Sequence, residues 1–184
     1  HRFVAELFLL PALYRQRQGL PVAEPYKKRV IAMARFAESY SPCHGLAPVV
    51  GDADDARALP LGTQPTNDHR HLIGCVGVEW EVPDLVADCS GPRAEVAWLC
   101  GAKRAMTLPS RVEAPELRSQ GFRLAGYYTM RSARSHVFID CAPVGQAGRG
   151  GHGHNDCLAF TATLEGCPIV VDAGSYLYTG SYEE

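Results

Sequence analysis

The hydrophobic pattern of this chain changes at about residue 121, and that change limits what the chain can fold into. Before it, apolar residues recur about every 3.6 positions, as in helices that bury one face. After it, short β-branched and aromatic runs are separated by turn residues, as in antiparallel strands. Helices followed by strands predict an α+β chain with two domains and exclude an alternating α/β fold.

The first hundred residues predict helices joined by loops rich in proline and glycine. Apolar positions follow the helical period from the start of the chain: they are Phe3, Leu7, Leu10 and Tyr14. Helices are expected over residues 2–18, 24–40, 68–80, 83–87 and 93–100, with a long loop over residues 43–66. Antiparallel helices of this kind are typical of a helical hairpin array.

Four strands are predicted in the second half, over residues 122–131, 136–141, 158–164 and 169–172. Residues 106–120 contain two prolines and alternating charges, and they predict a linker between the halves. Four strands make an incomplete sheet, so we expect the chain to be a fragment.

Composition excludes some classes of protein and leaves others open. The net charge of −2 argues against a nucleic-acid binder, which needs a basic face. No apolar run is long enough to cross a bilayer, since the best candidate, residues 3–13, contains Glu6 and Pro11. The seven cysteines form no CxxC pair, and we expect small buried hydrophobic residues and no disulfide framework.

Residues 148–156, Gly-Arg-Gly-Gly-His-Gly-His-Asn-Asp, carry the strongest functional signal. If this backbone is extended, His152 and His154 point to the same side and can face one ligand, which the small glycines allow to approach. Asp172 ends the apolar run of residues 168–171. Two histidines and a carboxylate, on two neighbouring strands, predict a metal site or an acid–base site.

Simpler interpretations exist for each of these residues. The histidines could lie in a surface turn and bond only to the backbone, and Asp172 could cap the turn at Gly174. Asp156 and its neighbour Asn155 could orient the turn that carries His152 and His154, which we call the histidine turn.

Other polar residues give weaker signals. Asp52, Asp54 and Asp55 suggest a solvated loop, because the glycine and glutamate of a calcium loop are missing. Arg131 and Arg149 could bind an anionic sugar, although exposed arginine is common.

Several segments, in order along most of the chain, resemble the heparinase II/III-like polysaccharide lyases. The most specific are GGHGHNDCLAF at residues 150–160 and GCPIVVDAGSY at residues 166–176, which resemble that family's His-Gly-His-x-Asp block and the strand after it. Further similar segments are residues 51–57, 68–70, 126–132 and 137–140. For Asp52, Asp54 and Asp55 the resemblance leaves a role facing the cleft open beside the solvated loop.

The resemblance implies an (α/α) toroid followed by an antiparallel β-sandwich, both incomplete here. Residues 1–105 would be the C-terminal helices of the toroid, residues 106–120 the linker, and residues 121–184 the N-terminal part of the sandwich.

The resemblance also implies a lyase that cleaves an acidic, uronate-containing glycan by β-elimination, with glycosaminoglycan, alginate and bacterial exopolysaccharide all suitable. His152 matches the catalytic histidine, while His154 and Asp172 match ligands of a divalent metal, zinc in some members. The third metal ligand is expected beyond Glu184 and further catalytic groups before His1, so the fragment alone is expected to be inactive. A periplasmic or secreted location follows from the same resemblance.

Two alternatives remain at the level of sequence. The protein could be a non-catalytic carbohydrate-binding or exopolysaccharide-assembly protein with a lyase-like fold. A metal-dependent hydrolase is favoured only by the His-x-His pattern and Asp172.

Overall fold

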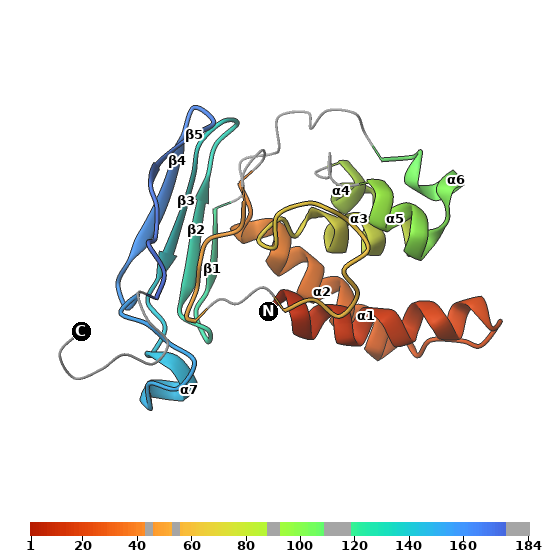
Figure 1. Cartoon of the computed structure of the whole chain (residues 1–184), viewed down its shortest axis with the longest axis horizontal. Helices are drawn as coiled ribbons and strands as arrows, with labels where there is room; N and C mark the ends of the chain where they lie inside the picture. The colour runs from red at the N-terminus through yellow and green to blue at the C-terminus, as the bar shows by residue number, and fades with distance from the viewer. Residues whose placement is uncertain (43–45, 53–55, 88–92, 109–118, 176–184) are drawn as a thin grey trace. The chain divides into compact units, whose positions relative to one another are not determined.

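The computed structural model describes residues 1–42, 46–52, 56–87, 93–108 and 119–175. The chain forms two compact units (Figure 1). The helical unit comprises His1–Ala47 and Asp55–Glu116, and the sheet unit comprises Pro48–Asp54 and Leu117–Glu184. Helices precede strands along the chain, which confirms the α+β class. Most of the predicted linker, residues 109–118, lies outside the described residues, as do Cys43 and Cys89.

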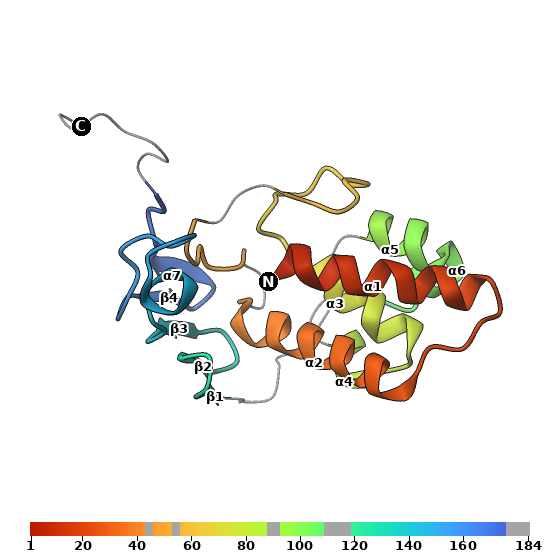
Figure 2. The same cartoon turned by 90° about the horizontal axis from the view of Figure 1, so that it is seen from below.

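The helical unit is organised around one central helix. Its elements are α1 (Arg2–Arg17), α2 (Glu24–Tyr40), α3 (Arg70–Glu79), α4 (Pro83–Ala87), α5 (Arg93–Cys100) and α6 (Ala102–Ala105). Helix α3 contacts all five of the others (Figures 1 and 2), and every residue from His71 to Glu79 is buried. A helix surrounded in this way needs small residues where neighbours come close: a Cβ added at Gly77 would lie 3.0 Å from the Val86 side chain. Glycine has a low helix propensity, but at Gly77 its lack of a side chain serves the packing of α3.

Helix α1 buries a different face from the one that the sequence predicts. Its buried apolar residues are Ala5, Leu9, Ala12 and Leu13. Phe3, Leu7 and Tyr14, which belong to the predicted core stripe, are exposed. The helix is apolar on more than one side, so periodicity alone does not decide which stripe faces the core. The two alanines on the buried side let the neighbouring helices approach closely.

A charged network is buried in the helical unit around Glu6. The Nε2 atom of His71 lies 2.9 Å from Glu6 Oε1, and the backbone N–H of Ala58 donates to Glu6 Oε2 at 2.8 Å. The guanidinium of Arg2 pairs with the same carboxylate at 3.1 Å. Burial alone would raise the pKa of Glu6, but the hydrogen bonds from His71 and Ala58 and the charges of His71 and Arg2 lower it from 4.5 to about 2.

The depressed pKa of Glu6 predicts acid-sensitive stability. Its contribution is complete above pH 4.5 and is lost as the pH falls from about 4.5 to about 2, which amounts to about 3 kcal/mol. Urea unfolding of the wild type and of Glu6→Gln, measured between pH 7 and pH 2.5, checks this. The pH dependence of the wild type should be steeper in this window, and parallel curves for the two proteins would contradict the assignment.

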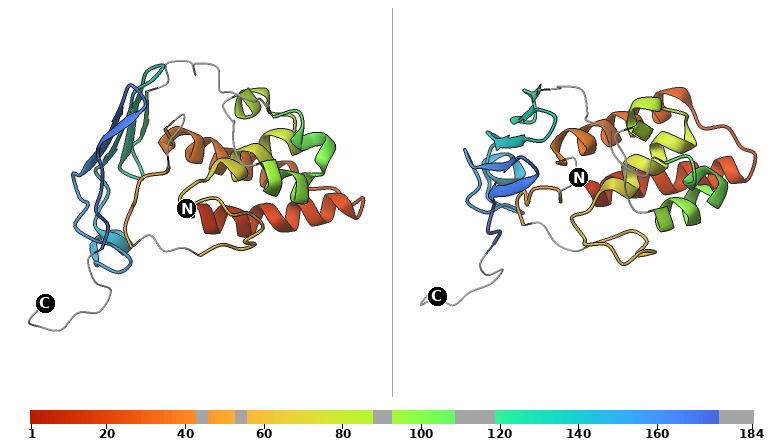
Figure 3. Two further views of the ribbon diagram at one scale, coloured as in Figure 1. Left: turned by 45° about the horizontal axis from the view of Figure 1, so that its top comes forward. Right: turned by 90° about the horizontal axis from the view of Figure 1, so that it is seen from above.

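The sheet unit contains β1 (Gln120–Phe122), β2 (Tyr127–Arg131), β3 (His136–Asp140), β4 (Phe160–Leu164) and β5 (Cys167–Val170). They form one antiparallel sheet in chain order, which Figures 1 and 3 show side by side. The register sets Thr129 of β2 opposite Phe138 of β3, and Phe138 opposite Thr161 of β4.

Two sequence predictions about the strands are wrong in detail. The single strand expected over residues 122–131 is two strands, because the chain turns at residues 123–126 and Gly126 takes a φ of 81°. The last strand ends at Val170, so Asp172 follows it by two residues. Cys75 and Cys100 are buried as expected, whereas Cys141, Cys157 and Cys167 are exposed.

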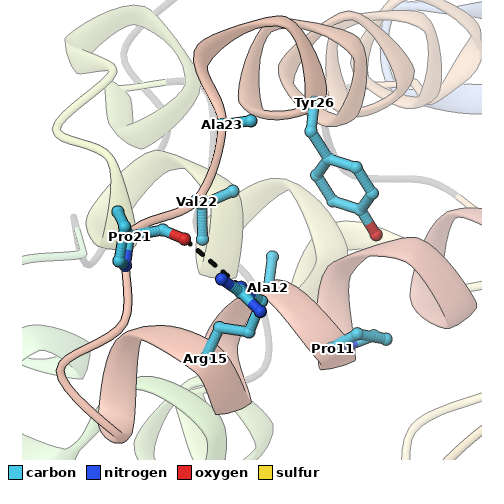
Figure 4. Close-up of a pocket in the computed structure, with 7 residues that line it drawn as sticks. All are labelled: Pro11, Ala12, Arg15, Pro21, Val22, Ala23 and Tyr26. Atoms are coloured by element: carbon cyan, nitrogen blue, oxygen red, sulfur yellow. Dashed lines mark hydrogen bonds between the residues drawn. The ribbon is translucent and has the colours of Figure 1, made fainter.

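A hollow lies between α1 and the start of α2 in the helical unit, as Figure 4 shows. Its lining residues are Pro11, Ala12, Arg15, Pro21, Val22, Ala23 and Tyr26. Arg15 Nε donates to the carbonyl oxygen of Pro21 at 3.2 Å, which fixes the chain where it enters α2. None of the site residues predicted from the sequence lies in this hollow.

Candidate active site

The glycine-rich segment joins the short α7 (Gly145–Gly148) to β4, and it is not extended. His152 has a φ of 57°, in the left-handed region, so the condition for the two imidazoles to share a side is not met. The two rings have different surroundings: the side chain of His152 is 70% exposed and that of His154 is 12% exposed. The extended backbone from which we expected both rings to face one ligand is therefore absent at His152.

His154 and Asp172 do come together. The Nε2 atom of His154 lies 2.8 Å from Asp172 Oδ1, and both side chains are largely buried. His154 precedes β4 and Asp172 follows β5, so the pairing of these two strands brings the residues to one end of the hairpin. Asp172 also accepts a hydrogen bond from the backbone N–H of Gly174 at 2.6 Å. The carboxylate thus both caps the turn and pairs with the histidine.

Two more carboxylates, those of Asp156 and Asp140, interact electrostatically with His154. Asp156 Oδ2 lies 3.3 Å from the Nδ1 atom of His154. Partial burial would lower the pKa of His154, but the hydrogen bond with Asp172, the charges of Asp156 and Asp172 and the Gly51 backbone outweigh it, and the net shift is upward. Burial raises the pKa of Asp140, and the charges of Asp156 and Asp172 add to that effect against the Ala142 N–H and His154. The cluster is therefore rich in negative charge.

The His154–Asp172 pair can be tested as part of a metal site. Imidazole and carboxylate are ordinary zinc ligands, and the His154 Nε2 and Asp172 Oδ1 atoms, 2.8 Å apart, are the two that would hold such an ion. The buried Nδ1 atom of His154 has no hydrogen-bond partner of good geometry. Among the described residues no group of three or more His, Cys, Asp or Glu side chains is placed to hold a metal ion. The described residues fit as two ligands of such a site.

A contact that the sequence does not predict joins His152 to Asp52. The Nδ1 atom of His152 lies 2.9 Å from Asp52 Oδ2. The Asp52 backbone N–H points at the His152 carbonyl oxygen at 3.5 Å, and the Gly51 N–H donates to Asp156 Oδ2 at 2.7 Å. Residues 48–52, which run beside the sheet in Figures 1 and 3, are thus held against the histidine turn.

Asp156 ties residues 48–52 to the histidine turn by accepting from the backbone N–H of Gly51, and the orienting role expected for Asn155 stays a prediction. Asp52, which the sequence suggests to be solvated, is a partner of His152. Asp54 and Asp55 lie outside the described residues. Arg131 is buried on β2, and Arg149 is exposed.

Close backbone packing holds the histidine turn. A Cβ added at Gly51, where φ is 62°, would lie 2.6 Å from the His152 carbonyl oxygen. A Cβ at Gly153 would lie 2.8 Å from the backbone nitrogen of Gly145. These glycines permit chain segments to touch, so the space beside Gly153 is filled by α7 rather than left for a ligand.

Gly51→Ala is therefore expected to destabilise the sheet unit by about 1–3 kcal/mol, because it adds a steric clash to the strain of a positive φ. The matched control is Gly166→Ala, with a φ of 81° and nothing within 4 Å of the added Cβ. The difference in melting temperature between the two variants measures the effect of the clash with the His152 carbonyl oxygen, because both carry the strain of a positive φ. Equal losses in the two variants would mean that residues 48–52 are not packed on the histidine turn.

Backbone strain gathers around the same segment. Of the non-glycine residues with positive φ in the described part of the chain, Gln146 and Ala147 lie within α7, and His152 and Leu158 lie between α7 and β4. Such conformations persist where surrounding contacts over-determine them, and they cluster at functional sites.

Residues 114–184 match the sequence model of the family described as "Heparinase II/III-like, C-terminal". No curated protein sequence matches the chain.

Two solved structures share its fold. They are the heparan sulfate lyase HepC from Pedobacter heparinus and a mutant of it, each 18% identical to the chain, with TM-scores of 0.61 and 0.60. The matches cover 100% and 98% of this chain and 25% of each lyase, so the chain spans about a quarter of their length.

Proposed function

We propose, from the heparinase II/III-like C-terminal domain that residues 114–184 carry, that the whole protein is a polysaccharide lyase acting on an acidic glycan by β-elimination. The observation that supports this best is the exposed imidazole of His152, held by Asp52 on a strained turn next to the His154–Asp172 pair. An exposed, fixed imidazole is suited to proton transfer with a bound substrate.

The reaction needs a group that can accept a weakly acidic proton. In β-elimination a base removes the proton from the carbon that bears the carboxylate, the electron pair forms a carbon–carbon double bond, and the oxygen on the neighbouring carbon leaves and is protonated. Neutral His152 can accept the proton or orient the sugar, and such a residue contributes about 10²–10⁴ in rate. Charge that develops on the substrate carboxylate must be stabilised as well.

The His154–Asp172 pair is proposed to hold a divalent metal, zinc being suited to these ligands, together with a further histidine in the rest of the protein. The bound ion would neutralise the surrounding carboxylates and keep the histidine turn ordered. His154 and Asp172 would orient the turn, and His152 would remain free to meet the substrate.

The substrate class is proposed to be a uronate-containing polysaccharide, with heparan sulfate the first to test because the structural neighbours are heparan sulfate lyases. Alginate and bacterial exopolysaccharides present the same weakly acidic carbon. A periplasmic or secreted location for the whole protein fits a polymeric substrate. Among the described residues, no helix is both long and apolar enough to span a membrane.

The test is an absorbance assay on the whole protein with heparan sulfate, chondroitin sulfate, hyaluronan, alginate and an uncharged glucan as control. Cleavage by elimination produces an unsaturated uronate that absorbs in the near ultraviolet. Absorbance that rises with an acidic glycan and not with the glucan supports the proposal. Binding without any rise would favour the alternative, a carbohydrate-binding or exopolysaccharide-assembly protein.

A further inference from the structure

We propose that Asp52 is a positioning residue for His152: its carboxylate holds the imidazole in the tautomer that carries the proton on Nδ1, and so leaves the Nε2 lone pair to the substrate. The inference rests on the proposed function for its catalytic meaning. The tautomer itself follows from the 2.9 Å contact between His152 Nδ1 and Asp52 Oδ2. An ionised carboxylate only accepts hydrogen bonds, so the nitrogen facing it must be the donor.

The loop that carries Asp52 is attached to the histidine turn independently of this contact. Gly51 donates its N–H to Asp156 at 2.7 Å, and its lack of a side chain permits the approach to the His152 carbonyl. Attachment by the backbone fixes where the carboxylate of Asp52 lies, which a freely moving loop would not do. A carboxylate in a fixed place can hold the imidazole in one orientation, whereas a transient contact with a mobile carboxylate cannot.

The other carboxylates nearby have different partners. Asp140 accepts from the backbone N–H of Ala142 at 2.7 Å, Asp156 accepts from Gly51, and Asp172 pairs with His154. Asp52 is the carboxylate that reaches His152. The exposed ring of His152 therefore has one nitrogen held and the other turned to the open side, the arrangement that a proton acceptor needs.

The tautomer can be measured directly by ¹⁵N NMR of the histidine side chains, at a pH where the rings are neutral. The signals of His152 are identified by their loss in His152→Gln. We expect the Nδ1–H form in the wild type, and a mixture of both forms in Asp52→Ala. In Asp52→Asn the amide can accept from Nδ1–H or donate to a bare Nδ1, so we expect a smaller shift towards the mixture, with the shape of the loop kept.

Kinetics on the whole protein provide the second measurement. Asp52→Asn and Asp52→Ala should lower kcat by about 10- to 100-fold, since misplacing a catalytic group costs on this order, while KM changes less than about threefold. Glu165→Gln is the matched control, because it removes a negative charge from an exposed turn at the other end of β4. It should leave kcat unchanged. Circular dichroism and backbone amide spectra report whether each variant is folded.

Failure of this inference is distinguishable from failure of the proposed function. A wild-type protein with the Nε2–H form, or with the same tautomer in Asp52→Ala, overturns the role of Asp52 even if the protein is an active lyase. A wild-type protein that cleaves no acidic glycan overturns the proposed function, and the NMR measurement still decides whether Asp52 orients His152. An equal rise of KM and fall of kcat in both Asp52 variants would indicate a substrate contact and also contradict the inference.

Discussion

His152→Ala is expected to reduce β-elimination by the whole protein by about 10²–10⁴-fold, the contribution of one positioned acid–base group. The ring is mostly exposed and its side chain contacts Asp52, so its loss removes little buried surface. The free energy of unfolding should therefore change by no more than about 0.5–1 kcal/mol. Production of unsaturated uronate and thermal unfolding, measured on the same preparation, check both parts.

The two measurements separate a catalytic role from a structural one. Loss of activity with an unchanged melting temperature supports proton transfer or substrate orientation by His152. Full activity in the variant would remove this residue from the mechanism. Loss of activity with a large fall in stability would instead show that the imidazole holds the strained turn together.

His154→Ala and Asp172→Ala are each expected to weaken zinc binding to the whole protein by at least about 100-fold. Changes in the residues that merely orient a ligand cost 10–100-fold, and loss of a ligand itself costs more. Elemental analysis after dialysis, and competition with a zinc chelator, measure the affinity. Both side chains lie at the same end of the β4–β5 hairpin, so the two substitutions should have similar effects on zinc affinity.

His152→Ala is the matched control for the metal, because it removes an imidazole two residues from His154. It should lower turnover by the same roughly 10²–10⁴-fold as above and keep the zinc. If the wild-type protein binds no divalent metal, the metal proposal is wrong and the 2.8 Å pair is a hydrogen bond alone. If His152→Ala also loses zinc, the division of roles between the two histidines is wrong.

The helices and strands were largely predictable because their signals are local. Helix α2 matches the predicted range of residues 24–40, since a proline at its first turn and a regular apolar period mark it plainly. The buried face of α1 was not predictable, because more than one of its sides is apolar and the choice depends on which helices pack against it. The division of residues 122–131 into β1 and β2 depends on a turn whose only local marker is Gly126.

The candidate site was predictable only in part, for the same physical reason. His154 and Asp172 are 18 residues apart and belong to adjoining strands, so a hairpin brings them together. Asp52 is 100 residues from His152. Residues 51–57 resemble a segment of the lyase family, but no local pattern identifies His152 as the partner of Asp52. The left-handed φ of His152 could not be foreseen either, because the turn takes this shape through contacts with Gly51 and with α7.

At His152 the demands of thermal stability and of the proposed catalytic role are opposed, because its backbone is in the left-handed region. A residue other than glycine costs about 1–2 kcal/mol in this conformation, so His152→Gly would relax the chain while deleting the imidazole. Laboratory evolution that selects only for resistance to heat would favour glycine here. The product would be more stable and would lack the imidazole that we propose for catalysis. Mutant libraries of this protein should therefore keep His152 unchanged.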